Sequence, residues 1–144
     1  MKKVNSILCA IDLSQHSAQV LEQCFRFVNQ LGAERLVVLH TCHSEQISTS
    51  DGPISAPIEE CFSDAKLKLE KLIQKQDPIQ ADISIRVIEG DPVDTILKTV
   101  ETTETDLVIL GTGGKTGINR FLLGSVAENV TRKSTTPVLI VRAQ

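Results

Sequence analysis

A glycine-rich stretch at residues 111–125 is the part of the sequence best suited to chemistry. Its five glycines follow an apolar run at residues 107–110 and precede an amphipathic pattern that begins at Ser125, so the stretch joins a predicted strand to a predicted helix. Glycines in such a connection let the backbone approach an anion with its N–H groups pointing inward, and the free N–H groups of a helix start favour negative charge. We interpret the stretch as a cradle for nucleotide phosphates.

Two familiar phosphate-binding patterns do not account for this stretch. Residues 114–116 read Gly-Lys-Thr, but the earlier glycine of a P-loop would fall at Ile109, inside the predicted strand. A dinucleotide pattern G-x-G-x-x-G that starts at Gly111 fails because Thr116 occupies its last position. The alternative is a flexible loop in which Ser125 is an ordinary helix N-cap, but five glycines in one strand-to-helix connection favour the cradle.

The elements that must position this cradle alternate along the chain. Five short apolar runs lie at residues 7–11, 36–39, 83–87, 107–110 and 138–141. Continuous apolar runs are typical of strands that helices cover on both faces, whereas the alternating run at 83–87 indicates a more exposed edge strand. Helical patterns separate the runs, giving the order β-α-β-α-β-α-β-α-β. We therefore predict an α/β fold, a three-layer doubly wound parallel sheet with helices on both faces.

Several helix boundaries can also be predicted. The first helix carries its apolar positions on one face, and Gly32 lies beyond its end; these positions are Ala18, Leu21, Phe25 and Val28. The third helix has the clearest start, because Asp91 is a good N-cap and Pro92 suits the first helical position. The fourth is expected to run from about Ser125 to Lys133.

The spacing Gly111-x2-Gly114-x9-Gly124-Ser125 resembles the ATP-binding signature of the universal stress protein family. The resemblance covers the whole chain: residues 7–12 resemble the first strand with its terminal acidic residue, residues 36–40 the second and residues 136–141 the last. It implies a five-stranded parallel sheet in the spatial order 3-2-1-4-5. Ligands bind such a sheet beyond the carboxyl ends of strands 1 and 4, where Asp12 and Gly111 fall.

The resemblance also implies a role for individual residues. Asp12 would meet the ribose or the base, although it could instead cap the first helix or turn the chain before Ser14. The main chain at Thr41 would recognise adenine, and Lys115 or Arg120 could add positive charge at the rim. The complete implied ATP-binding set is Ala10, Ile11, Asp12, Thr41, Leu110, Gly111, Thr112, Gly114, Lys115, Arg120, Gly124, Ser125 and Val126.

No catalytic residue or metal-binding set of side chains is predicted. The three histidines lack the spacing of zinc ligands, and His40 is expected to be a core or crevice-edge residue. A divalent cation, Mg²⁺ or Mn²⁺, would be held mainly by the nucleotide phosphates.

The amino-acid composition excludes several classes of protein. The 144 residues include 41% hydrophobic and 23% charged residues, as expected for one globular domain over residues 1–144. The net charge of −3 and the absence of Trp and Tyr argue against nucleic-acid binding. No apolar run approaches the ~20 residues that span a bilayer, and the N-terminus does not resemble a signal peptide. We expect a cytoplasmic protein without a membrane partner.

The four cysteines are expected to be reduced, small and buried. Cys9, Cys24, Cys42 and Cys61 form no C-x-x-C pair and lie in or near apolar segments. Whether Cys42, near the mouth of the crevice, responds to redox conditions is left open.

Two surface features suggest partners. Residues 42–56 are rich in Ser, Thr, Gly and Pro and are expected to form an irregular segment, either a lid, a partner-binding loop or a disordered surface loop. Residues 138–141 would form an edge strand that is apolar on both faces. An exposed apolar edge promotes aggregation unless another strand or chain covers it. The resembled family commonly dimerises through this strand, so a homodimer is expected.

Three functional classes follow from these residues. The favoured one is an ATP-binding regulatory protein of the stress-response type, whose nucleotide changes its conformation or partners. A slow ATP hydrolase or a phosphoryl or adenylyl transferase is the second, although no residue is identified to orient a nucleophile. The third is an interaction module without nucleotide, against which the complete glycine signature argues.

Overall fold

The apolar runs form a single parallel sheet in a computed structural model that describes residues 2–43, 46–55, 58–113 and 123–142. Its strands are β1 (Ser6–Ala10), β2 (Arg35–Cys42), β5 (Asp82–Glu89), β6 (Leu107–Gly111) and β7 (Val138–Val141). Their spatial order is β5-β2-β1-β6-β7, and every neighbouring pair is parallel. This is the predicted order 3-2-1-4-5, with the central strands buried on both faces.

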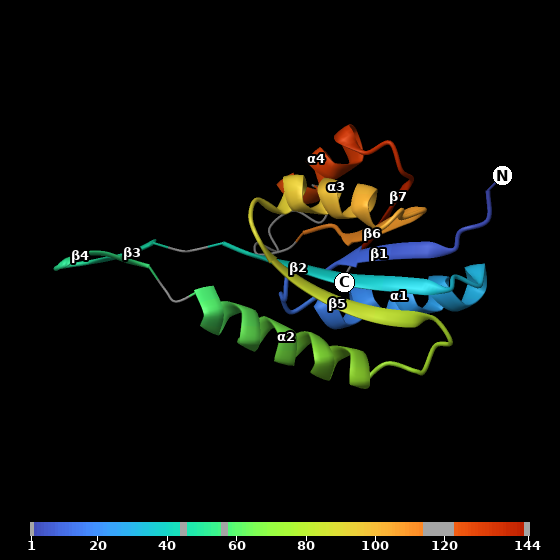
Figure 1. The fold of residues 1–144 in the computed structure, drawn as a ribbon, viewed down its shortest axis with the longest axis horizontal. Helices are drawn as coiled ribbons and strands as arrows, with labels where there is room; N and C mark the ends of the chain where they lie inside the picture. The colour runs from blue at the N-terminus through green and yellow to red at the C-terminus, as the bar shows by residue number, and fades with distance from the viewer. Residues whose placement is uncertain (1, 44–45, 56–57, 114–122, 143–144) are drawn as a thin grey trace.

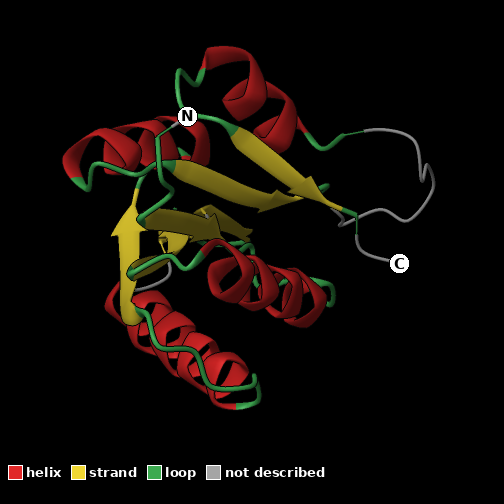
Figure 2. Cartoon of the chain, turned by 90° about the vertical axis from the view of Figure 1, so that its right-hand side faces the viewer, coloured by secondary structure: helices red, strands yellow, loops and turns green. Residues whose placement is uncertain are grey.

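Four helices cover the sheet in two layers (Figures 1 and 2). They are α1 (Ser17–Leu31), α2 (Ile58–Gln74), α3 (Pro92–Thr102) and α4 (Ser125–Lys133). Side chains of α1 and α2 pack with Ile7 and Cys9 of β1 on one face, whereas those of α3 and α4 pack with Leu8 on the other. The alternation of side chains along β1 thus feeds two separate apolar cores.

The predicted helix ends are confirmed where a specific residue sets them. Gly32 follows α1 with φ 63°, in the left-handed conformation that glycine adopts most readily, and Asp91 Oδ1 accepts a hydrogen bond from the Asp94 N–H at 3.0 Å. The prediction that Ala18 faces inward is wrong. Ala18 is exposed, and the buried face of α1 begins instead with Ser17 and Val20.

The segment expected to be irregular at residues 42–56 contains a hairpin. β3 (Gln46–Thr49) and β4 (Gly52–Ser55) pair antiparallel with each other and with no strand of the main sheet, and in Figure 1 they extend past the carboxyl end of β2. Two residues connect Thr49 to Gly52, the commonest hairpin loop length. The strands are too short, and too rich in turn-forming residues, for their pairing to be predicted.

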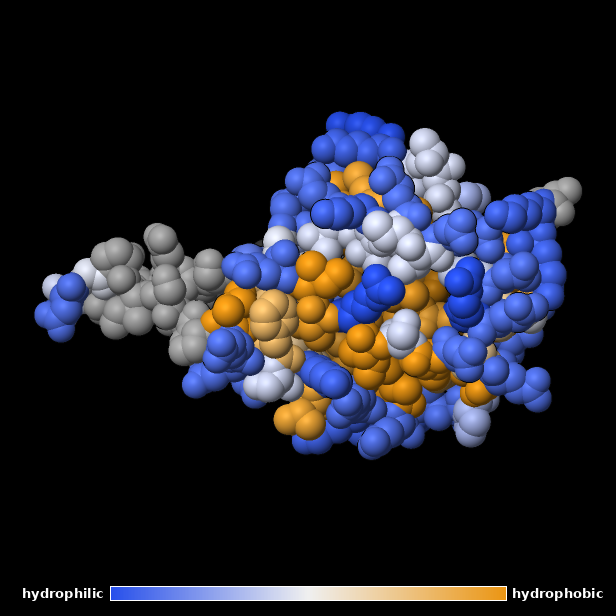
Figure 3. Space-filling model, viewed as in Figure 1, coloured by the Kyte–Doolittle hydropathy of each residue, from blue (hydrophilic) through white to orange (hydrophobic). Residues whose placement is uncertain are grey.

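The two edges of the sheet differ in cover. β5 exposes much of its length, as its alternating sequence predicted, and Ile83 is 37% exposed. In β7 only Val141 is buried and the other residues are half-buried. Figure 3 shows apolar side chains gathered over α2 and β5 on the face that it displays.

Candidate functional site

The predicted crevice lies where the chain leaves β1 and β6 in opposite directions. After β1 it passes to α1 on one face of the sheet, and after β6 it continues toward α4 on the other. The strand ends are held in register by backbone bonds from Ile11 N to Leu39 O at 2.8 Å and from Thr112 N to Val141 O at 3.1 Å. Such a switch point is where open α/β sheets bind ligands.

Asp12 lies at this switch point and also organises the start of α1. Its Oδ1 accepts hydrogen bonds from the Ser14 N–H at 2.9 Å and from the Ser17 hydroxyl at 3.3 Å. The turning role considered for Asp12 is therefore present. The residue is nonetheless exposed, and Oδ2 receives no hydrogen bond from the described residues, so one oxygen can accept from a ligand while the other holds the turn.

His40, in β2, contacts the backbone that follows β1. Its Nδ1 lies 2.7 Å from the carbonyl oxygen of Ile11. A carbonyl can only accept, so Nδ1 carries the proton, and in neutral imidazole Nε2 is then an acceptor. The half-buried His40 thus fixes the backbone next to Asp12, in agreement with the crevice-edge role predicted for it. Thr41, the next residue, is also half-buried.

Two glycines close the loop that follows β6. Gly113 has φ 82°, and the Gly124 N–H donates to Thr112 O at 2.5 Å. A Cβ on Gly113 would lie 3.0 Å from Gly124 Cα, and a Cβ on Gly124 would lie 2.9 Å from Thr112 O. The two backbones pass too closely for side chains. Gly113 was not among the predicted site residues, although its place within the glycine run was a signal for it.

Gly111 has a packing reason to be glycine. A Cβ at this position would lie 2.9 Å from Val20 Cγ2, so α1 can pack against the end of β6 only if residue 111 has no side chain. The interpretation of Gly111 as a phosphate-approach residue is therefore not needed to explain its identity.

The start of α4 has no side-chain cap from its own N-cap residue. Gly124 is its N-cap, without a side-chain hydrogen bond to the first turn, and Ser125 is the first helical residue. The alternative in which Ser125 is the N-cap is therefore wrong. Ser125 is exposed and Val126 is half-buried.

The structure brings together most of the predicted set. Ala10, Ile11 and Asp12 follow one another at the end of β1, Thr41 is near the end of β2, Leu110, Gly111 and Thr112 end β6, and Gly124, Ser125 and Val126 start α4. Gly114, Lys115 and Arg120 lie outside the described residues. Within the described ranges, no group of three His, Cys, Asp or Glu residues could hold a metal ion.

Comparison with known families identifies the domain. The model of the universal stress protein family matches residues 3–142. The chain belongs to the universal stress protein family. Among curated members, universal stress protein MJ0577 of Methanocaldococcus jannaschii is 28% identical over 94% of this chain and 93% of its own length. Universal stress protein YxiE of Bacillus subtilis is 31% identical over 96% and 99%.

Solved universal stress proteins share this fold. The structure of the Methanocaldococcus jannaschii protein superposes with a TM-score of 0.79 at 28% identity and covers 99% of both chains. A universal stress protein in complex with cAMP gives a TM-score of 0.66 at 24% identity over 99% of this chain and 100% of its own. The Archaeoglobus fulgidus protein in complex with dAMP gives 0.63 at 18% identity over 96% and 98%.

This universal stress protein domain also contains a bond that sequence reasoning missed. Cys42, at the end of β2, and Cys61, in α2, form a disulfide with their Cα atoms 6.5 Å apart. The expectation of reduced cysteines is therefore wrong for this pair, and the expectation of burial is confirmed for Cys42 but wrong for Cys61, which is only half-buried. Cys9 and Cys24 are buried free thiols, as predicted. A separation of 19 residues carried no signal, because the fold alone juxtaposes the pair.

No helix among the described residues has both the length and the apolar character required for a membrane span.

Proposed function

We propose that this chain is an ATP-binding universal stress protein that acts in stress response through nucleotide-dependent conformation or partner binding. The observation that carries the proposal is the convergence of three features at one switch point: Asp12, the close pass of Gly113 and Gly124, and the start of α4. Together they provide a carboxylate for a ribose hydroxyl and backbone N–H groups for phosphate oxygens.

An adenine nucleotide is the ligand favoured by the relatives. The universal stress proteins solved with cAMP and dAMP have the same fold and carry that base. In this chain Ala10 and Ile11 would line the base pocket and the main chain at Thr41 would recognise the adenine edge. Lys115 and Arg120 would add charge toward a triphosphate, with Mg²⁺ or Mn²⁺ held mainly by its oxygens.

Release of bound nucleotide tests the proposal directly. The protein is purified without added nucleotide and denatured, and the released adenine compounds are identified by chromatography and mass. ATP is the expected species, and calorimetry should then show ATP binding to the emptied protein. Release of ADP together with turnover of added ATP would instead assign a slow ATPase. No released nucleotide and no thermal shift with millimolar ATP would leave an interaction module and refute the proposal.

A matched pair of glycine substitutions tests the loop closure. Gly113→Ala places a Cβ 3.0 Å from Gly124 Cα, so ATP affinity should fall by roughly tenfold or more as the backbone donors separate. Gly52→Ala is the control, because Gly52 also has positive φ but a Cβ there meets nothing within 4 Å. Equal affinities in the two variants would contradict the cradle.

We further propose a cytoplasmic homodimer that pairs through β7. Its half-buried apolar edge, Val138–Val141, would be covered by the same strand of a second copy. Sedimentation at micromolar concentration should show a species of twice the 15.7 kDa monomer mass. A monomer alone would refute the assignment of this edge.

A further inference from the structure

The Cys42–Cys61 disulfide fastens the first two turns of α2 to the end of β2. The buried residues of α2 are Ala65 and Leu69, both beyond its first two turns. Residues 58–64 are half-buried or exposed throughout. The bond to Cys42, which is itself 2% exposed at the end of β2, is therefore the one covalent attachment of these turns to the sheet. Because the attachment is to β2, it also joins them to the strand that carries His40 and Thr41.

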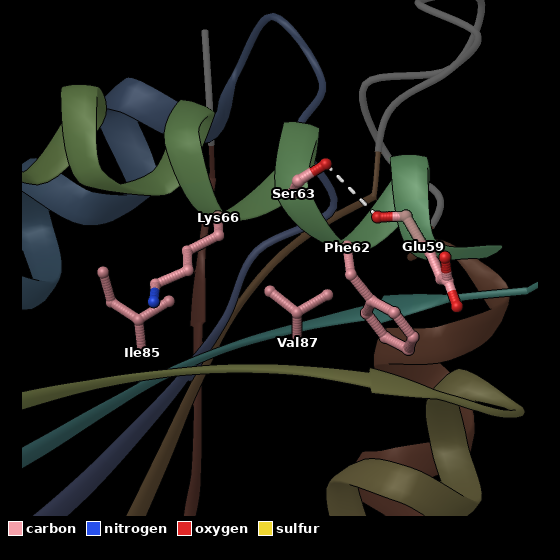
Figure 4. Close-up of a pocket in the computed structure, with 6 residues that line it drawn as sticks. All are labelled: Glu59, Phe62, Ser63, Lys66, Ile85 and Val87. Atoms are coloured by element: carbon pink, nitrogen blue, oxygen red, sulfur yellow. Dashed lines mark hydrogen bonds between the residues drawn. The ribbon is translucent and has the colours of Figure 1, made fainter. Parts of the chain in front are cut away.

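The same turns form one wall of a groove. Glu59, Phe62, Ser63 and Lys66 of α2 face Ile85 and Val87 of β5 around a cavity of about 480 Å³ (Figure 4). The side chains of Phe62, Ile85 and Val87 make its floor apolar, and the groove is open to solvent. Glu59, Phe62 and Ser63 of this wall belong to the turns that the disulfide attaches to β2.

The two sulfurs differ in access. Cys61 is half-buried on the first turns of α2, whereas Cys42 is almost completely enclosed. An attacking thiolate must reach the sulfur in line with the S–S bond, so attack falls on Cys61 Sγ and Cys42 is the leaving group. The other two thiols are excluded from such exchange. Cys9 and Cys24 are fully buried, and their mutual hydrogen bond together with burial raises the pKa of Cys9 well above its usual value, which keeps it as an unreactive thiol.

We propose that Cys42–Cys61 is a reversible thiol–disulfide site, exchanged by a low-molecular-weight thiol of the glutathione type, that fastens or releases residues 58–64. In reduction, a glutathione thiolate attacks Cys61 Sγ, the S–S bond breaks, and Cys42 leaves as a thiolate that takes a proton from water. A second glutathione thiolate then attacks the glutathione sulfur of the mixed disulfide and releases Cys61. Two thiols of glutathione are oxidised to its disulfide and the protein disulfide is reduced by two electrons. The reverse reaction with oxidised glutathione closes the bond.

This proposal is independent of nucleotide binding, and a thiol count tests it. The full chain is equilibrated in glutathione buffers from fully oxidised to fully reduced, denatured in iodoacetamide and weighed intact. Two labelled cysteines are expected at the oxidising end and four at the reducing end, with peptide mapping assigning the change to Cys42 and Cys61. Four labels throughout, two labels throughout, or a change at Cys9 and Cys24 would each overturn the proposal.

Single variants test which sulfur is attacked. In Cys42→Ser, the accessible Cys61 should gain a glutathione adduct from oxidised glutathione within the time in which the wild type re-forms its disulfide. In Cys61→Ser, the enclosed Cys42 should remain free over the same period. Adducts on both variants at similar rates, or on Cys42 alone, would contradict attack at Cys61.

Amide hydrogen exchange tests the structural consequence. Reduction of the wild type should speed exchange in residues 58–64 several-fold and leave the segment after Ala65 unchanged, because Ala65 and Leu69 still anchor it. The double variant Cys42→Ser/Cys61→Ser should exchange at the reduced rate in both buffers, and Cys24→Ala should respond as the wild type does. Unchanged exchange in the reduced wild type would refute the fastening role.

Discussion

The N-termini of α3 and α4 differ in how their first backbone N–H groups are capped. Both lie on the same face of the sheet, and each leaves backbone N–H groups without helical partners. At α3 the chain supplies its own acceptor, since Asp91 Oδ1 takes the Asp94 N–H. At α4 the N-cap is Gly124, which has no side chain to offer. One helix start is capped by the side chain of its N-cap residue, and the other has no side chain at that position.

A second self-supplied acceptor lies at the opposite end of the sheet. Asp106 Oδ2 accepts from the N–H groups of Asn5 and Ser6 at 2.9 and 3.0 Å, and Oδ1 lies 3.1 Å from Lys2 Nζ. Burial acts to raise the pKa of Asp106, but these hydrogen bonds and the Lys2 charge outweigh it, so the pKa lies below its usual value. The comparison indicates that carboxylates accept backbone N–H groups at the structural ends of elements, whereas the N-cap of α4 is a glycine without a side chain.

Placing a carboxylate at the N-cap of α4 should have the largest effect. Gly124→Asp adds a Cβ that would lie 2.9 Å from Thr112 O and an anion where phosphate is proposed to bind. ATP affinity measured by calorimetry should fall at least about 100-fold, because juxtaposed like charges cost several kcal/mol. Gly124→Ala separates the two causes, since it keeps the steric conflict without the charge and should bind more tightly than the Asp variant. Equal affinities for ATP in the Asp variant and the wild type would remove α4 from the site.

Removing the charge of Asp106 should cost stability without affecting the nucleotide. Asp106→Asn keeps an oxygen that can accept from the Asn5 and Ser6 N–H groups, but these hydrogen bonds and the ion pair with Lys2 lose the negative charge, so the free energy of unfolding at pH 7 should fall by about 1–3 kcal/mol. Because the folded-state pKa is lowered, this stabilisation is complete above the unfolded-state pKa of about 3.9 and disappears as the pH falls through the folded-state value. Urea unfolding should therefore show a larger difference between the two proteins at pH 7 than at pH 3. Lys2→Met is the control, with a loss below about 1 kcal/mol for an exposed ion pair.

Asp12 holds a turn through one carboxylate oxygen and is proposed to bind the ligand through the other. An isosteric substitution should separate these two roles. In Asp12→Asn the amide oxygen can still accept from the Ser14 N–H, so the thermal midpoint should change little. The second oxygen becomes an amide donor, and ATP affinity should fall by roughly tenfold with the loss of a charged hydrogen bond. A lowered midpoint with unchanged ATP affinity would show that Asp12 serves only the turn.

The smallest effect is expected at α3. Asp91→Ala removes the N-cap and should reduce the free energy of unfolding by about 1 kcal/mol. ATP affinity should stay at the wild-type value, because α3 contributes no residue to the proposed site. A change in affinity comparable with that of Gly124→Asp would abolish the distinction between the two helix starts.

Features that are determined by residues close together in the sequence could be predicted. The strands follow from continuous apolar runs, the Asp91 cap from residue type and neighbours, and the sheet order from the family resemblance. Three parts of the candidate site could also be predicted from the sequence and the family resemblance: the switch point, Asp12 and the glycine run. Whether those residues bind ATP stays a prediction.

Features that depend on what the fold brings together could not be predicted. The packing of Gly111 against Val20 and the contact of Gly113 with Gly124 exist only once helix and strand ends have met. The Cys42–Cys61 bond joins a strand end to a helix that the β3–β4 hairpin separates along the chain. Ala18 was expected to face inward because alanine is apolar. Burying a single methyl group contributes too little free energy to decide which face of a helix is buried.

The position of β1 at the centre of the sheet has a consequence for biosynthesis. Its residues pair with β2 on one side, but on the other side Ile7 pairs with Leu107, 100 residues later. At translation rates of about 5–20 residues per second, the ribosome needs roughly 5–20 s to make that interval. During this time one buried edge of the nascent β1 has no partner strand. The first of these strands to be synthesised is thus among the last to be completed.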